Sequence, residues 1–104
     1  MKVYDKLVRD KIPEIIEGSG KKCEVEVVSD DVALNYLYIK LEEETKELLE
    51  DKNLEEIADI MEVLFAIANK YGYSEEDVLS KRSEKKNSRG GFNNNLVLKN
   101  ISKL

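Results

Sequence analysis

Pairs of carboxylates recur at helical spacing in the middle of this chain. Glu44 and Glu47 are three residues apart, and so are Glu56 and Asp59. Residues at this spacing lie on one face of an α-helix. If the chain folds antiparallel about the polar stretch 51–53, Glu44 comes level with Asp59 and Glu47 with Glu56, because the residue numbers of both cross-pairs have the same total. Four carboxylates at one place repel one another unless a cation lies among them, so the spacing predicts a cation site between two helices.

The composition restricts the chemistry of such a site. The chain has no His, and Cys23 is its single Cys, which excludes imidazole ligands, Cys clusters and an intrachain disulfide. Hard carboxylate oxygens suit Mg²⁺. Asp59 lies in an apolar run, 57–61, where a charge needs a partner or a metal. Taken singly, the acids also have ordinary explanations: surface charge, a helix cap for Glu56, and an ion pair with a nearby Lys for Glu47.

Acidic and basic residues are segregated along the chain. The net charge is −5, with the acids concentrated between Glu42 and Glu62 and the cations toward the two ends. This pattern suits a metal site that binds a polyanion, although two solvated helix faces of opposite sign produce the same pattern. Glu62 continues the three-residue spacing and either extends the site or is solvated. The candidate phosphate-binding cations are Lys81, Arg82, Lys85 and Arg89 near the end of the chain and Lys6 and Arg9 near its start.

Apolar periodicity and capping residues predict four helices. The first is short and has Pro13 in its first turn, where proline is tolerated. The second and third are the antiparallel pair, capped at Ser29 or Asp30 and at Asn53. The fourth follows Ser74 and gives way to a loop that begins at Asn87. The expected ranges are about 12–17, 31–50, 54–71 and 75–86.

The remaining local pattern is a short strand. Residues 23–27 alternate between apolar and polar side chains, and residues 95–98 are the other segment that could pair with them. The expected architecture is therefore all-α: a helical bundle whose antiparallel helix pair carries the acidic site, with room for a minor two-stranded β-ribbon.

The length of 104 residues indicates one domain, residues 1–104. Charged residues make up 38% of the chain and there is one Pro, which is typical of a soluble helical protein. No apolar run is long enough to span a membrane and no signal peptide is visible. We therefore expect a cytoplasmic protein without a membrane partner.

The acidic residues carry a resemblance to a known superfamily. Glu43-Glu44-x-x-Glu47 followed by Glu56-x-x-Asp59 resembles the signature of the all-α nucleoside triphosphate pyrophosphohydrolases. This superfamily includes MazG-like proteins and phosphoribosyl-ATP pyrophosphohydrolase. The terminal motifs 6–13 and 89–92 resemble those of a small subgroup similar to the latter enzyme, so the resemblance covers most of the chain.

The resemblance implies Mg²⁺-dependent hydrolysis between the α- and β-phosphates of a nucleotide, which releases a nucleoside monophosphate and pyrophosphate. It implies that Glu43 is the catalytic base or an outer ligand and that the metal ligands are Glu44, Glu47, Glu56 and Asp59. The expected partners are a nucleotide substrate and further copies of the chain, as a homodimer or homotetramer, and no nucleic acid polymer. The preferred base stays unassigned. Two alternatives remain: phosphoribosyl-ATP hydrolysis, and a helical binding or assembly module without catalysis.

Overall fold

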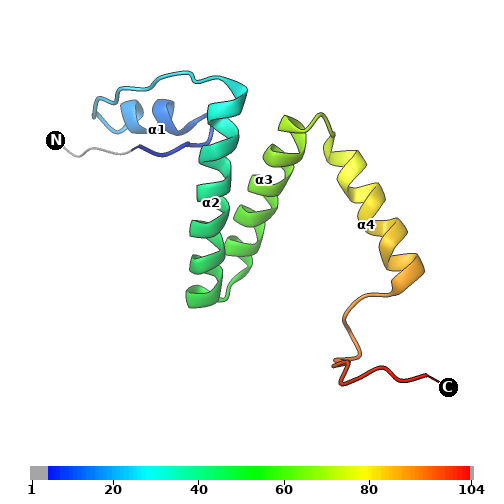
Figure 1. The fold of residues 1–104 in the computed structure, drawn as a ribbon. Coiled ribbons are helices and arrows are strands. Elements are labelled where there is room, and N and C mark those ends of the chain that lie inside the picture. Colours follow the sequence, from blue (N-terminus) through cyan, green and yellow to red (C-terminus); the bar gives the residue numbers. More distant parts are fainter. Residues whose placement is uncertain (1–4, 104) are drawn as a thin grey trace.

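The structure, a computed structural model, describes residues 5–103 and is built from α-helices (Figure 1). This confirms the all-α prediction. Residues 1–4 and 104 of the predicted domain lie outside the described part. None of the helices in residues 5–103 combines the length and apolar character that a membrane span needs. The helices are α1 (Ile12–Gly18), α2 (Asp30–Asp51), α3 (Leu54–Lys70) and α4 (Glu75–Arg89).

Local capping and turn residues determine where the antiparallel helices α2 and α3 begin and end. The Ser29 side chain accepts a hydrogen bond from the Val32 backbone at the start of α2. Lys52 ends α2 in the left-handed conformation with φ 52°. Asn53 follows at once and caps α3 by accepting from the Glu56 backbone N–H at 3.0 Å. The connection is thus a two-residue turn, which forces the helices to lie side by side.

Apolar packing and two polar links hold α2 and α3 in one register. The buried core cluster consists of Leu37 from α2 and Val63 and Ile67 from α3. At the end of the pair remote from the turn, Lys70 Nζ lies 2.9 Å from Asp30 Oδ1. The hydroxyls of two tyrosines, Tyr38 of α2 and Tyr71 after α3, are hydrogen-bonded to each other. These contacts fix which residues of α2 lie opposite which residues of α3.

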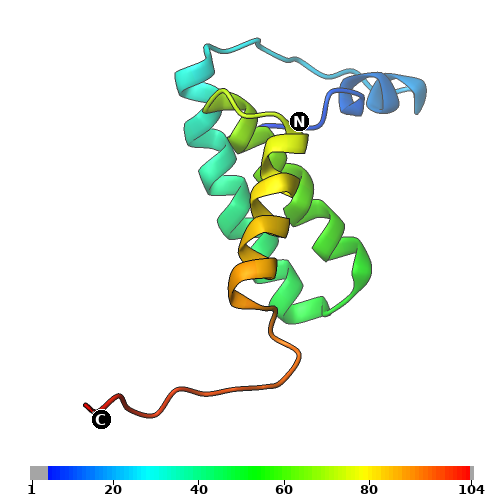
Figure 2. The same ribbon diagram turned by 90° about the vertical axis from the view of Figure 1, so that its right-hand side faces the viewer.

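Helix α4 contacts α3 and diverges from the α2–α3 pair (Figures 1 and 2). The turn before it has Gly72 at φ 93°, where a residue with a Cβ would be strained. Ser74 and Asp77 then form a complete capping box. The expected loop from Asn87 is wrong, since the helix continues through Arg89. No helix breaker occurs before Gly90, which has φ 84°.

The expected β-ribbon is also wrong, because the structure has no strand within residues 5–103. Residues 23–27 belong to an extended link between α1 and α2, whereas 95–98 belong to the tail beyond α4, at the other end of the molecule (Figures 1 and 2). Paired strands lie about 4.8 Å apart, so these segments cannot form a ladder. Val27 illustrates the outcome, with 97% of its surface exposed.

The chain is more extended than a compact domain of its length. Its radius of gyration is 18.6 Å and its longest dimension is 67 Å, whereas a compact chain of this size has a radius of gyration of about 13 Å. The divergence of α4 and the extended tail account for this shape (Figure 1). Many apolar side chains are consequently exposed, including a row on α3 formed by Leu54, Ile57, Met61 and Leu64.

Candidate metal centre

Three of the four predicted metal ligands come together at the seam between α2 and α3. Glu44 of α2 and Glu56 and Asp59 of α3 each offer a carboxylate oxygen, and these atoms lie within 4.8 Å of one another. The two-residue turn and the Asn53 cap set the height of Glu56 on α3. The carboxylate of Glu56 lies in the acidic group, and only its backbone N–H takes part in the cap. The role of the three acids as ligands stays a prediction.

Glu44 is the buried member of this group. It is 9% exposed, and its Oε2 atom is buried without a hydrogen-bond partner. Glu56 Oε2 is in the same situation. Nearly all buried polar atoms in folded proteins have a partner, and those that lack one need an explanation such as an ion. Two orphaned carboxylate oxygens beside a third carboxylate are therefore the main evidence for a cation site.

The pKa values of both glutamates respond to this environment. Burial is the largest cause that raises the pKa of Glu44, and the adjacent Glu47 and Asp59 raise it further while Lys40 opposes them. Burial likewise raises the pKa of Glu56, followed by the negative charges of Glu47 and Asp59. Both effects disfavour the ionised form, so ionisation of these two glutamates costs free energy in the folded protein.

Glu47, the fourth predicted ligand, does not join the group of three. It is nonetheless a neighbour, because it raises the pKa of both Glu44 and Glu56. Its half-buried side chain on α2 is one turn from Glu44. The Glu47 side chain therefore lies close to both glutamates, although it is not part of the group of three.

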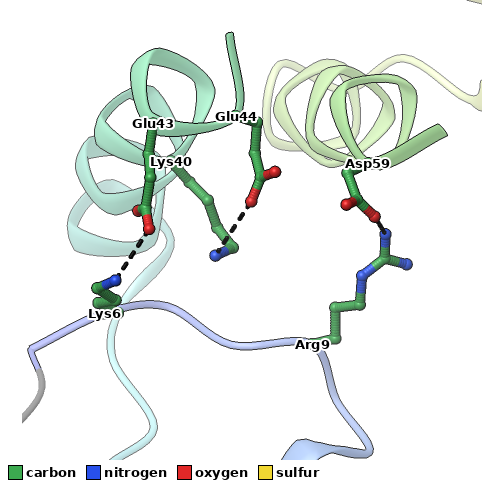
Figure 3. Close-up of polar contacts among 6 residues, drawn as sticks. All are labelled: Lys6, Arg9, Lys40, Glu43, Glu44 and Asp59. Carbon is green, nitrogen blue, oxygen red and sulfur yellow. Dashed lines mark hydrogen bonds and ion pairs between the residues drawn. The ribbon is translucent and has the colours of Figure 1, made fainter. Parts of the chain in front are cut away.

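Three cations lie on one side of the acids (Figure 3). Lys6 Nζ lies 2.9 Å from Glu43 Oε1, and Arg9 Nη2 lies 2.8 Å from Asp59 Oδ1. Lys40 Nζ lies 3.8 Å from Glu44 Oε1, one turn away on α2. Lys40 is not among the site residues predicted from the sequence, although a Lys four residues before an acid on a predicted helix is a recognisable signal.

Glu43, the predicted base, lies beside the group and points to the N-terminal segment (Figure 3). Its hydrogen bond with Lys6 is the largest effect on its pKa and lowers it, with a smaller contribution from Lys40. Glu43 is therefore ionised at neutral pH and can accept a proton. As long as Lys6 is bound to it, however, its basicity is reduced.

The structure does not bring the predicted cations of α4 to the acids. Among residues 5–103, none of them forms an ion pair with the acidic group; Lys81 instead pairs with Glu84 of its own helix at 3.0 Å. Arg89 borders an open hollow with Gly90, Gly91 and Phe92. Glu62 is exposed and outside the group, which favours its solvated interpretation. A role in phosphate binding for Lys81, Arg82, Lys85 and Arg89 stays a prediction.

The donor set fits a hard divalent cation. The three carboxylate oxygens lie within 4.8 Å of one another, so these side chains could together hold one hard divalent cation, for which oxygen ligands are preferred. Five carboxylates (Glu43, Glu44, Glu47, Glu56 and Asp59) face three cations (Lys6, Arg9 and Lys40), which leaves two negative charges unmatched. Oxygen ligands also suit Mn²⁺ and Ca²⁺, so the donor set defines the class of metal and not its identity.

Comparisons with protein-family models, with curated proteins and with solved structures found no match for this chain. What is established is therefore the class of the molecule: an all-α protein with a half-buried acidic centre at the seam of an antiparallel helix pair. The resemblance of its motifs to the pyrophosphohydrolases stays a prediction.

We expect Mg²⁺ to raise the melting temperature of the protein. A ligand that binds the folded state alone, at ten times its Kd, stabilises it by about 1.4 kcal/mol, or about 5–10 °C for a chain of about 100 residues. Differential scanning fluorimetry across 0–20 mM Mg²⁺ measures the shift, with Glu44→Gln as the variant that should lose it and Glu42→Gln as the exposed neighbour that should keep it. Equal shifts in wild type and Glu44→Gln would contradict the site.

Without metal, Glu44→Gln should be more stable than wild type at neutral pH. Folding raises the pKa of the Glu44 carboxyl, so the protonated form of this group stabilises the folded state. This stabilisation is complete below the ordinary pKa of 4.5 and is lost as the pH rises through the raised pKa of the folded state. The advantage of Glu44→Gln in EDTA should therefore be largest near pH 7 and shrink toward pH 4.5. Urea unfolding at several pH values measures this difference, and a constant difference would show that Glu44 does not titrate in this way.

Proposed function

We propose that this protein is a Mg²⁺-dependent nucleoside triphosphate pyrophosphohydrolase of the house-cleaning type. It would add water across the bond between the α- and β-phosphates and release a nucleoside monophosphate and pyrophosphate. The observation that carries the proposal is the buried Oε2 atom of Glu44, which has no hydrogen-bond partner although its carboxylate is grouped with those of Glu56 and Asp59. A polyphosphate substrate brings its own oxygens to a cation, and enzymes of phosphoryl chemistry hold Mg²⁺ through one or two carboxylates plus substrate phosphates.

The residues of the site divide into three roles. Glu44, Glu56 and Asp59 would hold the cation, with Glu47 as an outer ligand. Glu43 would orient the attacking water and accept its proton, because it is ionised and lies next to the ligands. A bound Mg²⁺ supplies neutralisation of the charge that develops on the phosphate oxygens. Lys6 and Arg9 enter from the N-terminal segment and would bind the phosphates (Figure 3).

The function is tested by pyrophosphate release from a panel of nucleoside triphosphates in the presence of Mg²⁺. We expect turnover by wild type and a loss of at least about 100-fold in Glu44→Gln and Asp59→Asn, the scale seen when one preorganised electrostatic contact is removed. Glu42→Gln changes the charge by the same amount on an exposed position of α2 and should stay active.

Two outcomes of this assay would replace the proposal. If no triphosphate is hydrolysed but phosphoribosyl-ATP is, the narrower activity is the correct one. If neither is hydrolysed while Mg²⁺ still binds, the chain is a binding or assembly module that retains the acidic centre. Equal activity of wild type and the two site variants would remove the centre from the chemistry.

We further propose that the chain forms a homo-oligomer through the exposed row on α3, named the α3 stripe: Leu54, Ile57, Met61 and Leu64. At 100° per residue these side chains share a face that differs from the face with Glu56, Asp59 and Val63. Helix α4 cannot cover the stripe along its length, because its last ten residues, 80–89, are polar. A second copy would bury the stripe and leave the acidic centre accessible, as a homodimer or as part of a homotetramer.

Met61→Glu should shift the protein toward the monomer, because it places a charge in the middle of the stripe. Sedimentation equilibrium at micromolar concentration measures the mass of the particle. Leu49→Glu is the matched control, since Leu49 is an exposed leucine of α2 outside the stripe. A wild-type protein that is monomeric at all concentrations, or equal dissociation by both variants, would contradict the interface.

A further inference from the structure

The chain segment 5–10 crosses the α2–α3 seam on the side to which Glu43, Glu44 and Asp59 point (Figure 3). We name this segment the N-terminal strap. It has no helix or strand up to Asp10, and its two basic side chains reach different helices. Lys6 contacts Glu43 of α2, while Arg9 contacts Asp59 of α3. The strap therefore supplies positive charge to the same acids that are left to hold a cation.

Asp59 takes part in two arrangements that conflict. Its Oδ1 atom accepts a hydrogen bond from Arg9 Nη2 at 2.8 Å, and the same carboxylate belongs to the group of three acids within 4.8 Å. A guanidinium on this carboxylate repels a divalent cation that binds beside it. Binding of a cation and the Arg9–Asp59 contact therefore oppose each other.

The contact is of a kind that breaks easily. The side chains of Arg9 and Asp59 are 54% and 33% exposed, and a single nitrogen of the guanidinium makes the bond. Exposed pairs of this type contribute little to stability. The backbone of the strap is anchored near Arg9, because Leu7 packs against the core of the α2–α3 pair. The side chain can thus turn away from Asp59 while the strap stays where it is.

We propose that Arg9 is an exchange residue that pairs with Asp59 in the metal-free protein and moves to the polyphosphate of the substrate when a divalent cation binds. The proposal rests on the proposed function for the nature of the second partner. A guanidinium suits both partners, because its planar fork of donors matches carboxylate and phosphate oxygens alike. The exchange couples the binding of the two ligands. The cation displaces Arg9 from Asp59, and the freed Arg9 then strengthens the binding of the polyphosphate. Polyphosphate binding must in turn strengthen cation binding by the same factor.

The test measures the two ligands separately in the full chain. Mn²⁺ binding, followed by the electron paramagnetic resonance of free Mn²⁺, should be about two- to fivefold tighter in Arg9→Gln than in wild type, the range that corresponds to the loss of one exposed ion pair. Binding of inorganic triphosphate at saturating Mg²⁺, measured by calorimetry, should be about tenfold weaker or more, because a charge-assisted hydrogen bond is lost. Lys11→Gln removes the same charge two residues away and should change neither affinity.

Opposite shifts of the two affinities, in Arg9→Gln alone, are the result that supports the exchange. Unchanged or weaker Mn²⁺ binding in Arg9→Gln would overturn it, and so would equal effects of Arg9→Gln and Lys11→Gln or an unchanged affinity for triphosphate. The exchange and the proposed hydrolysis can be contradicted independently of each other. If the opposite shifts are measured while no nucleotide is turned over, the exchange stands and the hydrolase assignment is wrong.

Discussion

The main physical constraint on this structure is a carboxylate that is buried among other carboxylates. Glu44 loses most of its contact with water and has Glu56, Asp59 and Glu47 as neighbours. A charge in this position is unfavourable unless a cation compensates it. The protein supplies part of the compensation through Lys40, Arg9 and Lys6, which are fewer than the carboxylates gathered at the seam.

The rest of the fold keeps this feature in place. The α2–α3 pair is the best-packed part of the described chain, with Leu37, Val63 and Ile67 at its core. The short turn at Lys52 and Asn53 and the links at the far end of the pair prevent a slip of one helix along the other. The acids consequently cannot relax apart, and relief of their repulsion has to come from protons, from side-chain cations or from a bound metal.

Much of this arrangement can be read in the sequence. The caps at Ser29, Asn53 and Ser74 and the apolar periodicity predict the three long helices to within a few residues, because these signals act over one or two turns. The i, i+3 spacing places the acids on one face of each helix for the same reason. The predicted ribbon failed because strand pairing requires that two segments distant in the sequence meet, and alternation within each segment carries no information about that.

The sequence by itself therefore determined the helices, their caps and the faces on which the acids lie, since all of these follow from local backbone geometry. The tertiary structure alone decided that the Oε2 atom of Glu44 is buried without a hydrogen-bond partner while Glu47 stands outside the group of three. It also decided that the strap, and not α4, brings cations to the acids. Burial and long-range ion pairs depend on how elements of the fold pack against each other. Arg9 and Asp59, for example, form an ion pair although they are 50 residues apart in the sequence.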